Sequence, residues 1–260
     1  MLAVISPAKS LDFETRPTTR KSTLPDFVDD AAILIADLVK LAPGDISDLM
    51  GISQKLGELN CNRYNEWRRD DNGGKQAALA FTGDVYMGLG AWDFTARELT
   101  SLQRRVRILS GLYGLLRPLD KIHPYRLEMG TAFANKRGPD LYAFWGQKVT
   151  DALNSELEGH RNRTLVNLAS NEYWRVVNAD RLQARVLDTR FLDTKNGKVK
   201  FISFFAKKAR GLMAAYIAKN NVETIKALKA FDYDGYRYSG ECSSADELVY
   251  VRAERDRRAR

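Results

Sequence analysis

The stretch FLDTKNGKVKFISFF, Phe191 to Phe205, decides which kind of sheet this chain can form. Two runs of strand-forming residues, Phe191–Thr194 and Val199–Phe205, flank the pair Asn196-Gly197. Asparagine and glycine tolerate the positive φ angles of a tight type I′ turn, so the stretch predicts a β-hairpin. A hairpin puts at least one antiparallel pair into the sheet, which argues against an all-parallel nucleotide-binding sheet.

Outside the hairpin, strand-like and helix-like patterns alternate along the chain. Short apolar runs predict strands at Leu2–Ser6, Ala77–Phe81, Val106–Leu109, Leu165–Leu168, Ala184–Leu187, Lys200–Phe205 and Glu247–Val251. Apolar residues at three- and four-residue steps predict helices that start at Pro25 and cover Phe94–Arg104, Leu141–Leu157 and Ala206–Lys219. This alternation predicts an α/β fold with a mixed sheet. Neither of the glycine-rich phosphate motifs, GxGxxG and GxxxxGK[ST], occurs.

Composition and charge exclude several classes of protein. The chain has 260 residues, of which 44% are hydrophobic and 28% charged, as in ordinary globular proteins. No apolar run is long enough to span a membrane, and no secretory leader is seen, so we expect a cytoplasmic protein without a membrane partner. Two cysteines are too few for a disulfide scaffold. The spacing of these cysteines and the two histidines suggests no metal site. We therefore expect neither a metal nor another cofactor.

The charge balance points toward a polyanionic partner. Lysine and arginine total 41 against 33 acidic residues, which gives a formal net charge of +8. Lysine and arginine side chains that neutralise phosphates release condensed counterions, so nucleic acid is a natural partner for such a surplus. A basic protein that is merely soluble is the competing interpretation.

The segment Ile46–Leu59 resembles a helix-hairpin-helix element between two short helices. Gly51 can take the left-handed conformation that ends one helix, Ile52 can fill the gap between the helices, and Ser53 can cap the next one. Backbone N–H groups at such a turn can bind a DNA phosphate, and Lys55 can add a cationic contact. Ser53 stands where a second glycine is usual, and Gly57 where alanine is commoner. An ordinary corner between two core helices is the alternative.

Two groups of residues elsewhere could hold an anion or carry chemistry. Lys9 follows the first predicted strand, and it could clamp a phosphate or act as an amine nucleophile. Arg126 and Glu128 alternate on one face if Pro124–Gly130 is extended, which suits a phosphate contact beside a carboxylate. A solvated lysine and an Arg-Glu ion pair that holds a loop are the structural alternatives.

Further candidates are Asp84, Arg117 and the cations of one helix. Arg117 lies in an Arg-Pro turn after two glycines that would let the chain approach another backbone closely. Asp84 lies in a strand-to-helix turn, where it is a helix cap or a catalytic acid. Lys207, Lys208 and Arg210 begin a predicted helix, where the dipole disfavours them, and this hints at an anionic partner. The basic stretch Arg252–Arg260 is expected to be a frayed or helical tail that adds non-specific affinity.

Taken together, these motifs resemble the YaaA family of bacterial peroxide stress resistance proteins, almost from end to end. The residues that carry the resemblance are Ile5–Lys9, Gly83–Tyr86, Leu109–Asp120, Pro124–Gly130, Val166–Tyr173 and Ile202–Met213. The resemblance implies a single domain over residues 1–260, with helices wrapped around a mixed sheet and a helix-hairpin-helix element at about 43–60. Residues 68–75 are a polar stretch that could break the chain into two lobes. The resemblance also implies a positively charged cleft.

Two functions from different classes follow. The resemblance implies a protein that binds double-stranded DNA, protects it during hydrogen peroxide stress, and is linked to limiting free iron. Contacts to the DNA backbone would make this binding largely independent of sequence. In this hypothesis the hairpin residues Gly51, Ile52, Ser53 and Lys55 grip a backbone, and a basic cleft is lined by Lys9, Arg117, Arg126, Lys207, Lys208 and Arg210. The alternative is an enzyme acting on a nucleobase or on damaged DNA, with Lys9 as amine nucleophile and Asp84 or Glu128 as acid or base.

Overall fold

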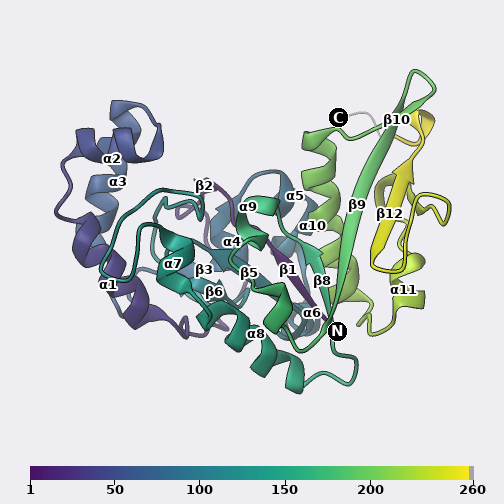
Figure 1. Cartoon of the computed structure of the whole chain (residues 1–260), viewed down its shortest axis with the longest axis horizontal. Helices are drawn as coiled ribbons and strands as arrows, with labels where there is room; N and C mark the ends of the chain where they lie inside the picture. Colours follow the sequence, from purple (N-terminus) through teal and green to yellow (C-terminus); the bar gives the residue numbers. More distant parts are fainter. Residues whose placement is uncertain (258–260) are drawn as a thin grey trace.

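The computed structural model describes residues 1–257 and contains an eight-stranded mixed sheet (Figure 1). The strand order is β11-β12-β9-β8-β1-β5-β6, and β10 pairs with β9. The bounds are β1 Leu2–Ile5, β5 Val106–Ser110, β6 Gly114–Leu116, β8 Thr164–Leu168, β9 Arg185–Lys195, β10 Lys198–Lys200, β11 Tyr236–Tyr238 and β12 Glu247–Arg252. The pairs around β1 are parallel, whereas β5–β6, β9–β10 and β11–β12 are antiparallel. The predicted mixed α/β sheet is therefore confirmed.

Helices cover this sheet and bury its central strand. They are α1 Val28–Leu38, α2 Pro43–Met50, α3 Gln54–Glu66, α4 Ala77–Ala80, α5 Asp84–Leu89, α6 Ala96–Arg105, α7 Leu141–Trp145, α8 Lys148–Glu158, α9 Asn171–Trp174, α10 Ser203–Lys219 and α11 Ile225–Lys229. All four residues of β1 are fully buried, so both faces of the central strand are covered. Helix α10 packs on α5 and α6 and reaches β9 and β1. No helix within residues 1–257 has the length and apolar character to cross a bilayer.

The hairpin at Asn196-Gly197 is confirmed, but its second strand is shorter than predicted. Both residues have positive φ, 52° and 71°, as a type I′ turn requires. The strand expected to reach Phe205 ends at Lys200, and α10 starts at Ser203. The alanine-rich sequence beyond Phe205 favours helix, and packing of α10 on α5 extends it toward the amino end, because tertiary contacts override the strand propensity of two phenylalanines.

Two other sequence-based expectations were wrong in detail. The predicted strand Ala77–Phe81 is a buried helical turn, α4, followed by the short strand β4, Phe81–Thr82. Alanine is the strongest helix former. The N–H groups of Ala77 and Ala78, which have no partner inside this short helix, donate to the carbonyls of Asp120 and Pro118. The single helix expected over Leu141–Leu157 is divided into α7 and α8 at Gly146, where φ is 48°. Positive φ ends a helix, and glycine accepts it at little cost.

Within residues 1–257, four short strands form two pairs outside the main sheet. β2, Ser10–Leu11, pairs with β4, and β3, Lys75–Gln76, pairs with β7, Lys121–Ile122. The polar stretch expected at 68–75 carries no helix or strand until β3 begins. Helices α2 and α3 pack on each other at one end of the molecule, and α10 lies toward the other end (Figure 1).

Candidate functional site

The carboxyl ends of β1 and β8 form the point where the direction of the sheet connections reverses. β5 pairs with one side of β1 and the later strand β8 with the other, so the segments after β1 and β8 diverge. Open α/β sheets commonly bind ligands at such a point. Here the N–H of Ser170 donates to Ser6 Oγ at 2.9 Å, and the Ser6 hydroxyl lies 3.3 Å from that of Ser170.

Lys9, Arg126 and Glu128 meet beside this point, as the sequence suggested for Arg126 and Glu128. Lys9 Nζ lies 3.0 Å from Glu128 Oε1, and Arg126 Nη2 also lies 3.0 Å from that oxygen. Lys9 is 66% exposed and Glu128 only 13%. Burial alone would raise the pKa of Glu128, but the charges and hydrogen bonds of Lys9 and Arg126 outweigh it, and the pKa is lowered. Glu128 therefore stays an anion that holds both cations in place.

Close packing positions the strand-like segment that carries Arg126 and Glu128. A Cβ atom added to Gly111 would lie 2.2 Å from the carbonyl oxygen of Leu127, so only glycine allows this approach. The expected close backbone contact of the glycines after β5 is thus confirmed at Gly111. The buried hydroxyls of Ser110 and Tyr125 lie 2.7 Å apart, which fixes the segment further. Glu128 Oε2 is buried and has no hydrogen-bond partner within residues 1–257, which leaves it as an unused acceptor.

The turn between α2 and α3 has the local conformation that the sequence predicted. Gly51 is left-handed, with φ 59°, and the N–H groups of Gly51 and Ile52 bond back to the carbonyls of Asp48 and Ser47. Ile52 is half-buried against the core. Ser53 occupies the N-cap position of α3, but its side chain makes no capping hydrogen bond.

The amino end of α3 therefore carries unused donors that face solvent. The N–H groups of Ser53, Gln54 and Lys55 make no hydrogen bond within the described part of the chain, and all three residues are exposed. The first turn holds no acidic residue, and Lys55 is a cation there. Gly57 explains how closely the helices approach, because an added Cβ would lie 2.1 Å from Ser47 Oγ and 2.4 Å from the carbonyl oxygen of Pro43. The sequence flagged Gly57 only as a departure from the usual alanine.

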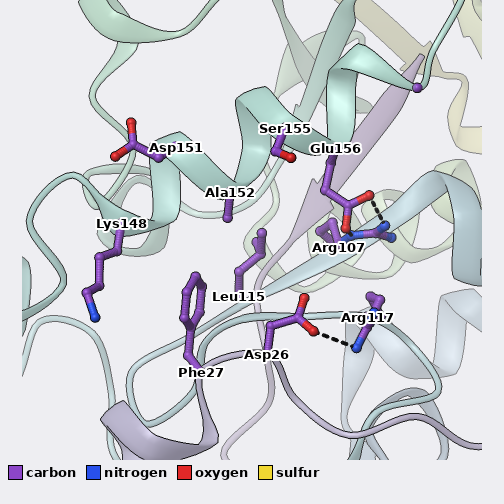
Figure 2. Close-up of a pocket in the computed structure, with 11 residues that line it drawn as sticks. Asp26, Phe27, Arg107, Leu115, Arg117, Lys148, Asp151, Ala152, Ser155 and Glu156 are labelled. Atoms are coloured by element: carbon purple, nitrogen blue, oxygen red, sulfur yellow. Dashed lines mark hydrogen bonds and ion pairs between the residues drawn. The ribbon is translucent and has the colours of Figure 1, made fainter.

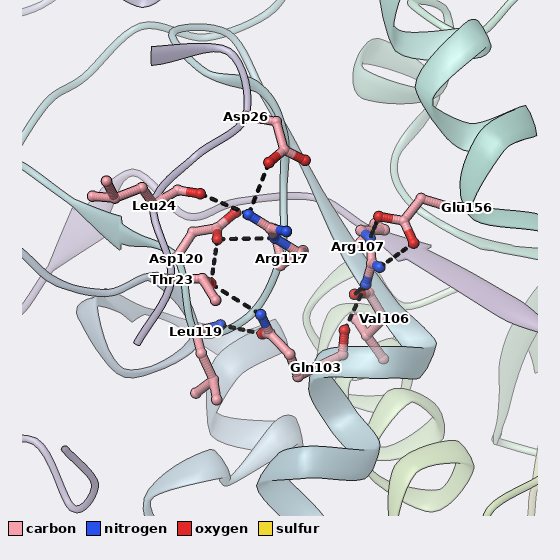
Figure 3. A network of polar contacts seen from close by, with 10 residues as sticks. All are labelled: Thr23, Leu24, Asp26, Gln103, Val106, Arg107, Arg117, Leu119, Asp120 and Glu156. Carbon is pink, nitrogen blue, oxygen red and sulfur yellow. Dashed lines mark hydrogen bonds and ion pairs between the residues drawn. The ribbon is translucent and has the colours of Figure 1, made fainter. Parts of the chain in front are cut away.

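Arg117 lies elsewhere, in a cavity of about 600 Å³ whose wall is formed largely by α8 (Figure 2). Its guanidinium donates to Asp120, to Asp26 and to the carbonyl of Leu24 (Figure 3). The neighbouring Arg107 forms two hydrogen bonds with Glu156. Burial raises the pKa of Asp120 even though Thr23 and Arg117 donate to it. Through these contacts Arg117 holds the segment before α1 in place, and its guanidinium has few donors left for a ligand.

The cations of α10 lie in a third place. Lys207 is exposed, Lys208 Nζ lies 3.5 Å from Asp234 Oδ2, and Arg210 is half-buried with no ion pair within residues 1–257. Burial lowers the pKa of Arg210. Asp84 lines the same cavity as Lys208, but it is the first residue of α5 rather than its cap, which is Gly83. Folding thus brings Lys9, Arg126 and Glu128 together and places Arg117 and Lys208 in two separate cavities.

Sequence reasoning missed a buried network near the carboxyl end. The stretch expected to be a frayed or helical tail is ordered over its first residues: β12 runs to Arg252, and a 3₁₀ turn covers Glu254–Asp256. Residues 258–260 of that basic stretch lie outside the described residues. Arg252 is buried, as are Leu248 and Tyr250 on the same face of the strand. Extending the alternation of this strand by one step could have revealed Arg252 as an inward-facing cation.

Comparisons with known proteins match nearly the whole chain. A family model described as "Peroxide stress protein YaaA" matches residues 1–242. A UPF0246 protein of Teredinibacter turnerae is 53% identical over 254 residues, which covers 97% of this chain and 99% of that protein. A UPF0246 protein of Cellvibrio japonicus is 54% identical over 256 residues, covering 98% and 99%. The resemblance drawn from the sequence motifs is confirmed.

Proposed function

Because the chain belongs to the family of the peroxide stress protein YaaA, we propose that it binds double-stranded DNA and protects it from oxidative damage during hydrogen peroxide stress. The proposal includes a link to limiting free iron, which the resemblance implies. An anaerobic iron titration of the purified protein tests whether this link is direct. Tight stoichiometric uptake would identify the protein itself as the metal binder.

The observation that carries the proposal is the exposed amino end of α3. Three backbone N–H groups that make no hydrogen bond within residues 1–257 lie at the positive end of this 13-residue helix. Its first turn contains Lys55 and no acid. An anion is the natural ligand of such a helix end, and a DNA phosphate fits it without any contact to a base. We propose that α2, the Gly51 turn and α3 act as a helix-hairpin-helix element that grips one DNA backbone.

Other cations would add affinity without adding sequence preference. Lys9 and Lys207 are exposed, and the formal net charge is +8, so phosphate contacts at several places are compatible with the charge distribution. Arg117 contributes less in this proposal, because its donors already serve Asp26, Asp120 and Leu24.

The environment of Lys9 favours phosphate binding over covalent chemistry. An exposed ammonium ion-paired with Glu128 differs from the desolvated amine that a Schiff-base nucleophile requires. The lyase alternative therefore has weaker support than binding, and it has a separate chemical test.

Fluorescence anisotropy of a labelled duplex, titrated at several salt concentrations, tests the proposal. We expect the logarithm of affinity to fall linearly with the logarithm of salt concentration, with little change between unrelated sequences. Ser53→Asp keeps a good N-cap but puts a negative charge where a phosphate would bind, so affinity should fall about tenfold or more while α3 remains stable. Thr224→Asp adds the same charge at the N-cap of α11 and is the matched control. Undetectable or salt-insensitive binding, or equal binding by both variants, would refute the proposal.

A further inference from the structure

The cavity that Lys208 and Asp84 line, between α5, α10 and the end of β12, has no role in the proposed grip on DNA. Its volume is about 1130 Å³, and its walls are more apolar than polar. Phe204, Phe205 and Tyr233 contribute aromatic rings, and Phe204 is 40% exposed. Cavities of this size with aromatic walls and a few polar groups are the usual sites for small ring-containing ligands.

The wall of this cavity contains a buried arginine with one unused donor. Arg252 is 3% exposed, and its guanidinium carbon lies 4.6 Å from the ring centroids of both Phe205 and Tyr236. Its Nε donates to Asp193 and its Nη1 to Asp234. Its Nη2 is buried and makes no hydrogen bond within residues 1–257. A buried donor without a partner is costly, so a ligand acceptor that reaches it would be bound favourably.

Positive and negative side chains line the cavity in equal numbers. This balance favours one kind of ligand over others. Three cations and three carboxylates line it: Lys208, Arg252, Arg257, Asp84, Asp232 and Asp234. An inorganic anion would gain contacts with the cations but would be repelled by the acids. A neutral flat ring that carries both acceptors and donors matches this wall better, because carbonyl oxygens can accept from arginine and amino groups can donate to carboxylates. Nucleobases have this combination, and their faces stack on aromatic side chains.

We propose that this cavity binds a nucleobase. The base stacks on the aromatic wall, with a carbonyl or ring nitrogen toward Arg252 and an exocyclic amino group toward Asp84 or Asp232. The base comes either from a free nucleoside or from an unpaired nucleotide of DNA. The second source rests on the proposed function, because it requires that the protein engages DNA.

The test compares two exposed phenylalanines, one that lines the cavity and one that does not. Phe204 lines the cavity, whereas Phe201 is 54% exposed and does not. Phe204→Ala is the test variant and Phe201→Ala its control, because both remove an exposed ring outside the core. Arg252→Ala is avoided, since it would remove the closer of the two arginines that neutralise the buried Asp193 and could prevent folding.

Two measurements distinguish the two sources of the base. The first titrates wild type and variants with a duplex that carries one unpaired 2-aminopurine, beside a fully paired duplex. Stacking should change the 2-aminopurine fluorescence, and Phe204→Ala should weaken binding of the unpaired DNA about tenfold while leaving the paired duplex unchanged. The second follows binding of adenosine, guanosine, cytidine and thymidine by ligand-observed NMR. Phe201→Ala should match wild type in both measurements.

The outcomes separate this inference from the proposed function. Nucleoside binding that Phe204→Ala abolishes supports the cavity as a base site even if no DNA binds. Dependence on Phe204 only with unpaired DNA supports a base delivered by the strand. Duplex binding without any fluorescence change, nucleoside signal or effect of Phe204→Ala overturns the inference and leaves the proposed function intact.

Discussion

The backbone N–H of Ser170 donates a 2.9 Å hydrogen bond to the hydroxyl of Ser6, across 164 residues of sequence. Each residue follows a parallel strand that lies in the centre of the sheet, Ser6 after β1 and Ser170 after β8. The bond joins the two carboxyl ends where the connections diverge. It therefore fixes the loop that carries Lys9 relative to the rest of the sheet.

Replacing Ser6 by alanine should loosen this junction. Ser6→Ala removes the acceptor of the Ser170 N–H, and we expect a loss of about 1 kcal/mol in the free energy of unfolding. Urea denaturation measures the change. Ser155→Ala, at an exposed position on α8 whose hydroxyl makes no hydrogen bond within residues 1–257, should remain close to wild type. Equal stabilities of the two variants would contradict the structural role of Ser6.

Gly57 should be intolerant of a methyl group. The added Cβ would meet the backbone carbonyl of Pro43 at 2.4 Å, so Gly57→Ala must push α2 and α3 apart. We expect a loss of about 1–3 kcal/mol in the free energy of unfolding and weaker duplex binding. Gly44→Ala lies on the same helix pair with nothing within 4 Å of the new Cβ, and it should be neutral or stabilising. Calorimetry measures the change in stability, and fluorescence anisotropy measures the change in duplex affinity.

The crossing of α5 and α10 depends on two facing glycines. A Cβ on Gly211 would lie 1.8 Å from the carbonyl oxygen of Val85, and one on Gly88 would lie 2.0 Å from that of Lys208. Gly211→Ala should therefore cost about 3 kcal/mol in unfolding free energy, because backbone cannot give way as a side-chain end can. Gly159→Ala, where the nearest atom is 3.6 Å away, is the control. A melting temperature of Gly211→Ala equal to that of wild type would show that the helices can separate freely.

His160 should make the fold less stable in mild acid. Burial, then the positive N-terminus and Arg105, lower the pKa of His160 from 6.5 to about 4. Between pH 6.5 and pH 4 the unfolded chain binds a proton on His160 that the folded protein does not. Because of this difference, the free energy of unfolding is unaffected by His160 above about pH 6.5 and decreases as the pH falls toward 4. His160→Gln should flatten the stability curve over that window. Urea midpoints measured from pH 7 to pH 4 test this, and parallel curves would count against it.

Lys9 should contribute to binding by charge and not by covalent chemistry. Lys9→Ala should reduce duplex affinity modestly and lower the salt slope by about one, as expected for a single phosphate contact. Lys226→Ala, an exposed lysine on α11, is the control for general charge loss. Borohydride treatment with abasic DNA should trap no adduct in wild type. An adduct that disappears in Lys9→Ala would instead establish the lyase alternative.

Much of the fold followed from local patterns. The first strand, the Asn196-Gly197 turn and the Gly51 turn were predicted correctly, because each depends on residues within a few positions of each other. The strand predicted over Lys200–Phe205 failed, because packing of α10 on α5 decided its conformation. The helix predicted over Leu141–Leu157 missed the break at Gly146 for a similar reason, since an isolated glycine within a helical pattern does not reveal its φ angle.

In the candidate sites, too, some features followed from the local sequence and others depended on the fold. The residue types at Lys9, Arg126 and Glu128 suggested an anion site, but only folding placed Lys9 against Glu128. Of the cations expected to line one basic cleft, Lys9 and Arg126 lie together, whereas Arg117 and Lys208 line two other cavities, since a count of cations carries no distances. Arg252 was assigned to a loose tail, although it is packed between two rings.

The sequence alone determined the family, the mixed sheet, the basic balance and the local turns, because motif order, hydrophobic periodicity and backbone preference act over short range. Only the tertiary structure decided which cations are already neutralised by carboxylates, which helix end keeps its donors, and which aromatic rings enclose a cavity. Coulombic and hydrogen-bond partners are chosen by distance in space, and residues such as Ser6 and Ser170 acquire that proximity only when the sheet forms.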